Sequence, residues 1–230
     1  IRGKLLSVGD ALWFGCYIST TQVFGIILHD VLGFDKASAT LINAAGGIGY
    51  ALARILSAFV IRVKHCRGDK KDKQLILRGL YVSTVIVAGM MMCLSQISKG
   101  ASVEVLVLVK FLLDAAFSFG LSSLAALLPQ WSHCKNKEKY PRYDFATMNG
   151  ITGFSGALAA PIFTLALTFL SAEFGGDIYK EYFLLNSILT IGFSVAMFVF
   201  NKRLDENREG SGRCHDDAIE KSASQVRLVS

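Results

Sequence analysis

The chain has 230 residues, of which 52% are hydrophobic and 18% charged, with a mean hydropathy of +0.44 and a formal net charge of +6. The charged fraction is below the ~25% of an ordinary soluble domain, and the charges gather in short blocks between long apolar runs. This pattern excludes a single soluble domain and indicates a protein that crosses a membrane several times. The basic residues lie mainly in the polar blocks, which argues against a nucleic-acid-binding protein.

Six apolar segments follow one another, each close to the ~20 residues that a helix needs to cross ~30 Å of hydrocarbon. Because only helices and closed barrels satisfy their backbone groups in lipid, all six are predicted to be transmembrane helices. The predicted spans are 11–32, 37–61, 75–97, 103–131, 145–170 and 182–200. They form an all-α transmembrane domain over 11–201, after a cytoplasmic linker over 1–10 and before a polar tail over 202–230. The tail is predicted to be disordered, and a trafficking or regulatory role for it is an open alternative.

Lysine and arginine alternate sharply between the connections of these segments. The first ten residues, the stretches 62–78 and 135–142, and the tail together hold 19 of the 24 basic residues. The other connections hold three, and Arg54 and Lys110 lie inside segments. Because cytoplasmic connections are enriched in lysine and arginine, both ends of the chain are predicted to be cytoplasmic. The chain starts at Ile1 without a signal peptide, so we interpret it as part of a longer protein.

The five cysteines form neither a disulfide framework nor a CxxC pair, and no cofactor or metal is predicted. Three of the four histidines adjoin a cysteine, in His65-Cys66, His133-Cys134 and Cys214-His215. A soft-metal site built from these pairs is conceivable, but zinc sites have more tightly spaced ligands, so chance is the preferred interpretation. The sequence contains no HExxH, GxSxG or paired intramembrane carboxylates, so we do not expect an enzyme.

Three charged residues lie well inside the predicted spans: Arg54, Lys110 and Asp114. A charge at the centre of a bilayer costs about 2.5–3.5 kcal/mol on insertion scales, so each is a functional-site hypothesis by default. Lys110 and Asp114 are i,i+4 neighbours that can form an ion pair. In a structural interpretation, one of the two cations neutralises Asp114 and fixes the helix register. In a functional one, the surplus positive charge binds an anionic solute or an acidic partner, and Asp114 is a proton site or a counter-charge.

Polar residues surround these charges at helical spacing. One stripe of the second segment carries Asn43, Gly47, Tyr50, Arg54 and Ser57. Gln22 ends a hydrophilic patch over 19–22, about half-way along the first segment. The predicted solute-binding residues are Arg54, Lys110, Tyr50, Gln22 and Asn43.

The fifth segment is rich in small residues. Gly153, Gly156 and Ala160 form a face suited to close helix packing, and Pro161 favours a kink. Gly153, Gly156 and Pro161 are therefore predicted to serve packing or gating rather than direct contact with a solute.

Six helices with both ends in the cytoplasm, interrupted by glycines and with few charges at mid-membrane depth, resemble the C-terminal half of a major facilitator superfamily transporter. The turn Val31-Leu-Gly-Phe-Asp-Lys-Ala-Ser38 looks like the lead into that family's eighth helix. Residues 46–67 look like the eighth helix with its cytoplasmic G-x-x-x-D-R loop, and residues 141–161 look like the start of the eleventh. In the loop, Ala58 replaces the glycine and Arg62 the aspartate, so the chain departs from the family's gating pattern.

Two branches of the superfamily share local patterns with the chain. Residues 146–158, together with 33–38, are similar to organophosphate/phosphate exchangers. Residues 52–59 look instead like the arginine-bearing eighth helix of monocarboxylate porters and nodulin-like proteins. In those porters the arginine meets the substrate carboxylate, a role that the resemblance gives to Arg54. Tyr50 stands one turn earlier, where the porters have an acidic residue.

The resemblance implies one half of a 12-helix transporter, whose N-terminal half completes a solute site near the membrane midplane. The expected function is transport of a small organic anion, a monocarboxylate or a phosphorylated metabolite, by alternating access with proton coupling or exchange. The alternatives are a transporter of a neutral solute, such as a sugar or an amino acid, and a non-transporting sensor or scaffold. The expected partners are the solute, the lipid bilayer and the N-terminal half; a plasma membrane and an organelle membrane both stay open.

Overall fold

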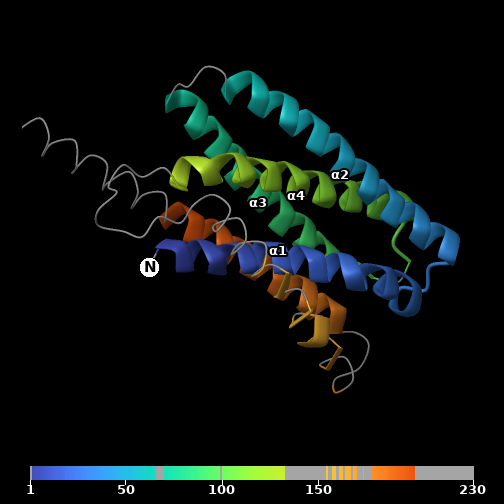
Figure 1. Ribbon diagram of the computed structural model, residues 1–230. Helices are drawn as coiled ribbons and strands as arrows, with labels where there is room; N and C mark the ends of the chain where they lie inside the picture. Colours follow the sequence, from blue (N-terminus) through green and yellow to red (C-terminus); the bar gives the residue numbers. More distant parts are fainter. Residues whose placement is uncertain are drawn as a thin grey trace, which may run out of the picture.

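The structure is a computed structural model that describes residues 2–65, 70–98, 100–132, 154, 157–158, 161–162, 164–166, 168–169, 173 and 178–199. Its continuous elements are α1 (Arg2–Ile26), the π-helical turn η1 (Ile27–Val31), α2 (Lys36–His65), α3 (Lys70–Ser95), α4 (Val103–Ser132) and a last helix over Tyr179–Val199 (Figure 1). The described residues contain no strand. The prediction of an all-α protein is confirmed for this part of the chain.

Several helices extend beyond the apolar segments that predicted them. α1 begins at Arg2, so residues 2–10, predicted as a linker, are helical and continuous with the first segment. α3 likewise begins at Lys70, ahead of the apolar residues that start at Leu75. Helical hydrogen bonds join backbone groups and continue through polar residues, whereas hydropathy marks only the part suited to lipid.

The connection between α1 and α2 has two features that hydropathy does not reveal. The Leu32 N–H donates to the Ile27 carbonyl at 2.9 Å, which is the i→i+5 bond of a π-helical turn. Gly33 follows with a φ of +78°, in the left-handed region that glycine adopts without steric cost. Asp35 then caps α2, because its Oδ1 accepts the Ser38 N–H at 3.2 Å. The Ser38 hydroxyl and this N–H lower the pKa of the exposed Asp35 carboxyl.

α4 packs most extensively against α2 and α3, and glycines allow the close approach. A Cβ at Gly46 of α2 would overlap the Asp114 carboxylate, and one at Gly49 would press on the α4 backbone. On the other side, a Cβ at Gly120 of α4 would overlap the Ser83 hydroxyl of α3. Small residues at such contacts let membrane helices approach each other closely.

The last helix packs against α1 and α3. The Phe193 ring stacks on Trp13 of α1, with ring centroids 5.1 Å apart. Asn186 Nδ2 donates to Thr20 Oγ1 at 3.0 Å, and the Ser187 hydroxyl donates to a backbone carbonyl of α3 at 2.8 Å. These contacts join the last helix to both α1 and α3.

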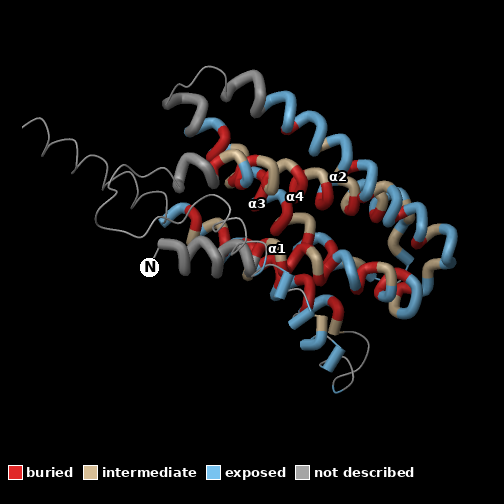
Figure 2. Tube along the Cα trace, in the orientation of Figure 1, coloured by how far each residue is buried: buried red, intermediate tan, exposed pale blue. Residues whose placement is uncertain are grey.

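Large apolar side chains are exposed on the outer faces, and Figure 2 shows α2 exposed along much of its length. Those of α2 are Leu41, Ile48, Leu52, Ile55, Leu56, Phe59 and Val60. In the described part of the chain, four helical stretches are long and apolar enough to cross a membrane: Lys36–Val60, Gln74–Ser95, Val103–Leu127 and Tyr179–Val199. These observations indicate a membrane-embedded protein. α1 is not one of the four, so the predicted span over 11–32 stays a prediction.

The count of six spans stays a prediction. The predicted span 145–170 lies largely outside the described residues, and the described positions between 154 and 173 are helical. Gly153 and Gly156 lie outside them, whereas Pro161 is helical and exposed. The predicted tail and the cysteines of the three His–Cys pairs also lie outside. Among the residues that the structure describes, no group of His, Cys, Asp or Glu is arranged to hold a metal ion.

Candidate functional site

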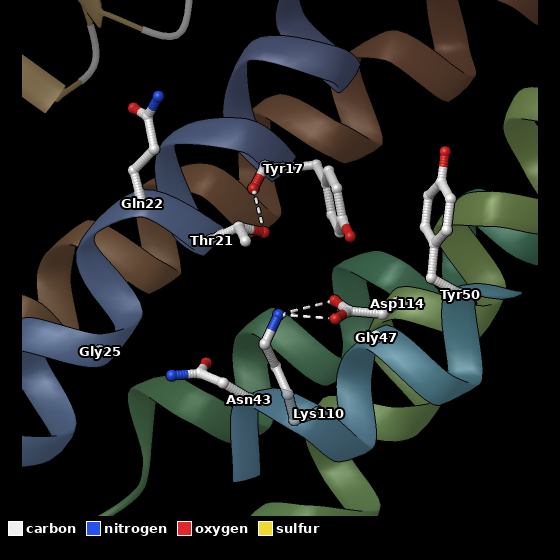
Figure 3. A pocket seen from close by; sticks show the side chains of 9 residues that line it. All are labelled: Tyr17, Thr21, Gln22, Gly25, Asn43, Gly47, Tyr50, Lys110 and Asp114. Atoms are coloured by element: carbon white, nitrogen blue, oxygen red, sulfur yellow. Dashed lines mark hydrogen bonds and ion pairs between the residues drawn. The ribbon is translucent and has the colours of Figure 1, made fainter. Parts of the chain in front are cut away.

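A cavity of about 420 Å³ lies among α1, α2 and α4 (Figure 3). Three helices line it: α1 with Tyr17, Thr21, Gln22 and Gly25, α2 with Asn43, Gly47 and Tyr50, and α4 with Lys110 and Asp114. On each helix these residues recur mainly every three or four positions, which places them on the face toward the cavity.

One wall of the cavity holds a buried ion pair. Lys110 Nζ lies 2.8 Å from each carboxylate oxygen of Asp114, the contact that their i,i+4 spacing predicts. The two residues are 1% and 4% exposed. In such surroundings each charge stabilises the other, because a buried charge without a partner is strongly unfavourable. The pair carries no net charge.

Aromatic rings and a glycine enclose the ion pair. The ring centroids of Phe24 and Tyr17 lie 5.4 Å and 6.0 Å from Lys110 Nζ, within the range of cation–π contacts. Figure 3 shows the Tyr17 hydroxyl directed toward Asp114. On the opposite side, the absence of a side chain at Gly46 lets α2 lie directly against the Asp114 carboxylate. The pair is therefore held by all three helices that line the cavity.

Amide and hydroxyl side chains supply the rest of the polar lining. Asn43 Nδ2 lies 3.5 Å from the position that a Cβ would take at Gly25, so α1 and α2 approach each other at this point. Gln22 Oε1 accepts a hydrogen bond from Thr164 at 3.0 Å, which joins the fifth segment to the wall. Tyr50 is half-buried, and its hydroxyl points away from the ion pair in Figure 3.

Arg54 does not line the cavity. It lies on α2 one helical turn beyond Tyr50, about 6 Å along the helix axis, and its side chain is exposed. No salt bridge joins it to an acid in the described part of the chain, since Asp114 pairs with Lys110. The structure therefore separates two cations, one neutralised at the cavity and one exposed outside it.

The structure brings five of the predicted site residues into one place. Lys110, Asp114, Tyr50, Gln22 and Asn43 all line the cavity, and their roles there stay predictions.

Four lining residues were not predicted to belong to the site: Tyr17, Thr21, Gly25 and Gly47. Three of them follow a signal in the sequence, because Tyr17, Thr21 and Gly25 recur every four residues on one face of α1. Gly47 lies on the predicted polar stripe of α2. Because it has no side chain, it leaves space in the cavity, and nothing lies within 4 Å of the position that its Cβ would take.

Comparison of the chain with protein-family models, with curated proteins and with solved structures gave no match. The superfamily resemblance therefore rests on the sequence patterns alone. Small-molecule sites are typically cavities of about 300–1,000 Å³, and the volume of this cavity lies within that range.

Proposed function

We propose that this chain is one half of a secondary active transporter that moves a small organic anion, with an N-terminal half completing the solute site. The observation that supports this most is a polar cavity with a buried ion pair, set among helices that are otherwise apolar. Ionisable groups at membrane depth characteristically face solute or ion pathways, and transporter sites lie between two repeats. Alternating access with proton coupling or exchange would move the solute through such a site.

Each predicted residue has a proposed role. Lys110 supplies the positive charge of the cavity, and Asp114 is its counter-charge or a proton site. Arg54, outside the cavity on the same helix as Tyr50, draws the anion toward it by long-range attraction. The residues proposed to hydrogen-bond the solute are Asn43, Tyr50 and Gln22.

We also propose that both ends of the chain are cytoplasmic, which the uneven distribution of 19 and three basic residues supports. α2 would then run toward the cytoplasm, and Arg54 would lie on the cytoplasmic side of the cavity. The glycines and Pro161 of the fifth segment would allow packing and bending as the protein alternates between its two states.

One observation favours a second candidate function. Because Lys110 is already neutralised by Asp114, the cavity as it stands has no net charge among its described lining residues. A neutral sugar or an amino acid would suit such a cavity, so transport of a neutral solute is the alternative to test.

The test is uptake of radiolabelled solutes by the full-length protein in liposomes, with and without a pH gradient. The panel is lactate, glycerol 3-phosphate, glucose and alanine. We expect one of the two anions to accumulate and the other two solutes to stay outside. Uptake of glucose or alanine without either anion would favour the second candidate, and no uptake of any member would contradict transport of small organic solutes.

Two variants of Arg54 test its proposed part in the uptake. Arg54→Ala should slow anion uptake strongly, and Arg54→Lys should retain part of the rate because it keeps the charge. Lys180→Gln, which removes an exposed cation at the start of the last helix, is the matched control and should transport normally. Normal uptake by Arg54→Ala would remove Arg54 from the proposal and leave the cavity in place.

A further inference from the structure

We propose that the solute anion binds at Lys110 rather than at Arg54, with Asp114 as its internal competitor, so that each singly charged anion enters the cavity with one proton. This inference rests on the transport function proposed above, and it names the groups that couple anion and proton. It differs from the role that the family resemblance gives to Arg54.

The charged groups at the cavity are few and close together. Among the described lining residues, Lys110 is the only cation and Asp114 the only acid. From α1, Tyr17 faces the pair, and from α2, Gly46 lies against the carboxylate. Tyr50 is the other titratable side chain of the lining. Any anion in this cavity therefore interacts with both Lys110 and Asp114.

An anion cannot join the ion pair as it stands. The pair is neutral, and a further negative charge would leave the buried site with an unbalanced charge. An anion that displaced the ionised Asp114 from Lys110 would also be unfavourable, because the Asp114 carboxylate would then be buried without a cation. The occupied site must lose one negative charge before an anion can be accommodated.

One proton resolves this conflict. When a proton from water adds to an oxygen of Asp114, the carboxyl becomes neutral, and Lys110 is left with a positive charge that one anion neutralises. The net charge of the site is zero in both states. In the empty site Lys110 pairs with the Asp114 carboxylate, and in the occupied site Lys110 pairs with the anion while Asp114 is protonated. A doubly charged phosphate ester would leave an excess of one negative charge, so a singly charged carboxylate suits the site better.

The cavity has room for such an anion next to the pair. Lys110 and Asp114 line the same cavity of about 420 Å³, and the position of a Cβ at Gly47 has no atom within 4 Å. The rings of Tyr17 and Phe24 flank Lys110 Nζ and reduce its contact with water, which strengthens its preference for a paired anion. The Asn43 amide is available at the cavity wall for the remainder of the solute, whereas the Gln22 amide oxygen already accepts a hydrogen bond from Thr164.

The consequence is a linkage between the two ligands, because each favours the binding of the other. While Asp114 is ionised in the empty site, each unit rise in pH lowers its protonated fraction tenfold, so the affinity for the anion should fall tenfold per pH unit. An anion that bound at Arg54 alone would not show this dependence on Asp114.

The experiment measures lactate binding and proton uptake together, with purified full-length protein in weakly buffered detergent solution. We expect about one proton taken up per lactate bound, and a dissociation constant that rises tenfold per pH unit. Asp114→Asn should bind lactate without proton uptake and without this pH dependence. Glu104→Gln removes an exposed acid from the first turn of α4 and is the matched control; it should behave as the parent.

Two further variants distinguish anion binding at Lys110 from anion binding at Arg54. Lys110→Met/Asp114→Asn removes both charges at once, so that no buried charge is orphaned, and it should lose lactate binding. Arg54→Gln should keep about one proton per lactate bound, as linkage at the pair requires. Loss of binding in Arg54→Gln with retention in the double variant would overturn the inference.

Other results separate this inference from the proposed function. Lactate binding without proton uptake by the parent, or binding of glycerol 3-phosphate in place of lactate, would overturn the inference and leave anion transport standing. Absence of uptake for every solute of the transport panel would instead contradict the proposed function itself.

Discussion

α1 presents polar side chains to two regions of the molecule that use them differently. Toward the last helix, Ser19 and Thr20 are fully buried, and Thr20 accepts a hydrogen bond from Asn186. Toward α2 and α4, Thr21 and Gln22 are exposed and line the cavity. Neighbouring positions of a helix differ by about 100°, so one polar run serves a closed interface and an open cavity.

The two regions differ in what their polar side chains border, which is open space in one and a neighbouring helix in the other. At the closed interface Asn186 donates to Thr20 across it, and the Ser19 hydroxyl donates to the Cys16 carbonyl of its own helix. At the cavity the two charges neutralise each other, while hydroxyl and amide groups border space that a solute can fill. Polar residues in an apolar helix therefore indicate a site only where they border such space.

The largest effect is expected from breaking the ion pair of the cavity. Lys110→Met leaves the Asp114 carboxylate buried without its cation, and removal of one partner of a buried pair costs about 3–5 kcal/mol of stability. Lys110→Met/Asp114→Asn should recover most of the loss. Thermal unfolding in detergent measures both variants. A single variant as stable as the parent would show that the pair does not hold the wall of the cavity.

A smaller effect is expected where α2 meets α4. Alanine at Gly46 would overlap Asp114, and overpacking of this kind costs about 1–3 kcal/mol. Gly47 is the matched control, because its Cβ position borders open space, and alanine there should be neutral or stabilise the helix by up to ~1 kcal/mol. The unfolding temperatures of the two variants make the comparison. Equal values would contradict direct contact between α2 and Asp114.

The smallest effect compares the two faces of α1 directly. Thr20→Val removes the acceptor of a hydrogen bond between helices, and such bonds contribute about 0.6 kcal/mol on average and up to ~1.7 kcal/mol. Thr21→Val removes only a bond to the Tyr17 carbonyl of the same helix, at 3.1 Å, and should be close to neutral. Parallel unfolding curves test this. Equal destabilisation by both would mean that the two faces are not distinct.

Much of the local structure could be predicted from the sequence. Hydropathy predicts helices over most of the described residues, because a helix in lipid needs apolar side chains along its length. The contact between Lys110 and Asp114 could also be predicted, since the i,i+4 relation lies within one helix. The contacts of Tyr17 and Gly46 with the ion pair could not be predicted, because they depend on where α1 and α2 lie against α4.

By itself, the sequence determined the apolar segments, the asymmetry of basic residues and the presence of two cations and one acid at membrane depth. Only the tertiary structure decided that Arg54 lies outside the cavity and that Thr20 and Thr21 face different regions. The physical reason is that hydropathy and i,i+4 contacts act along one helix. A cavity arises between helices, and the fit of side chains far apart in the sequence decides which residues border it.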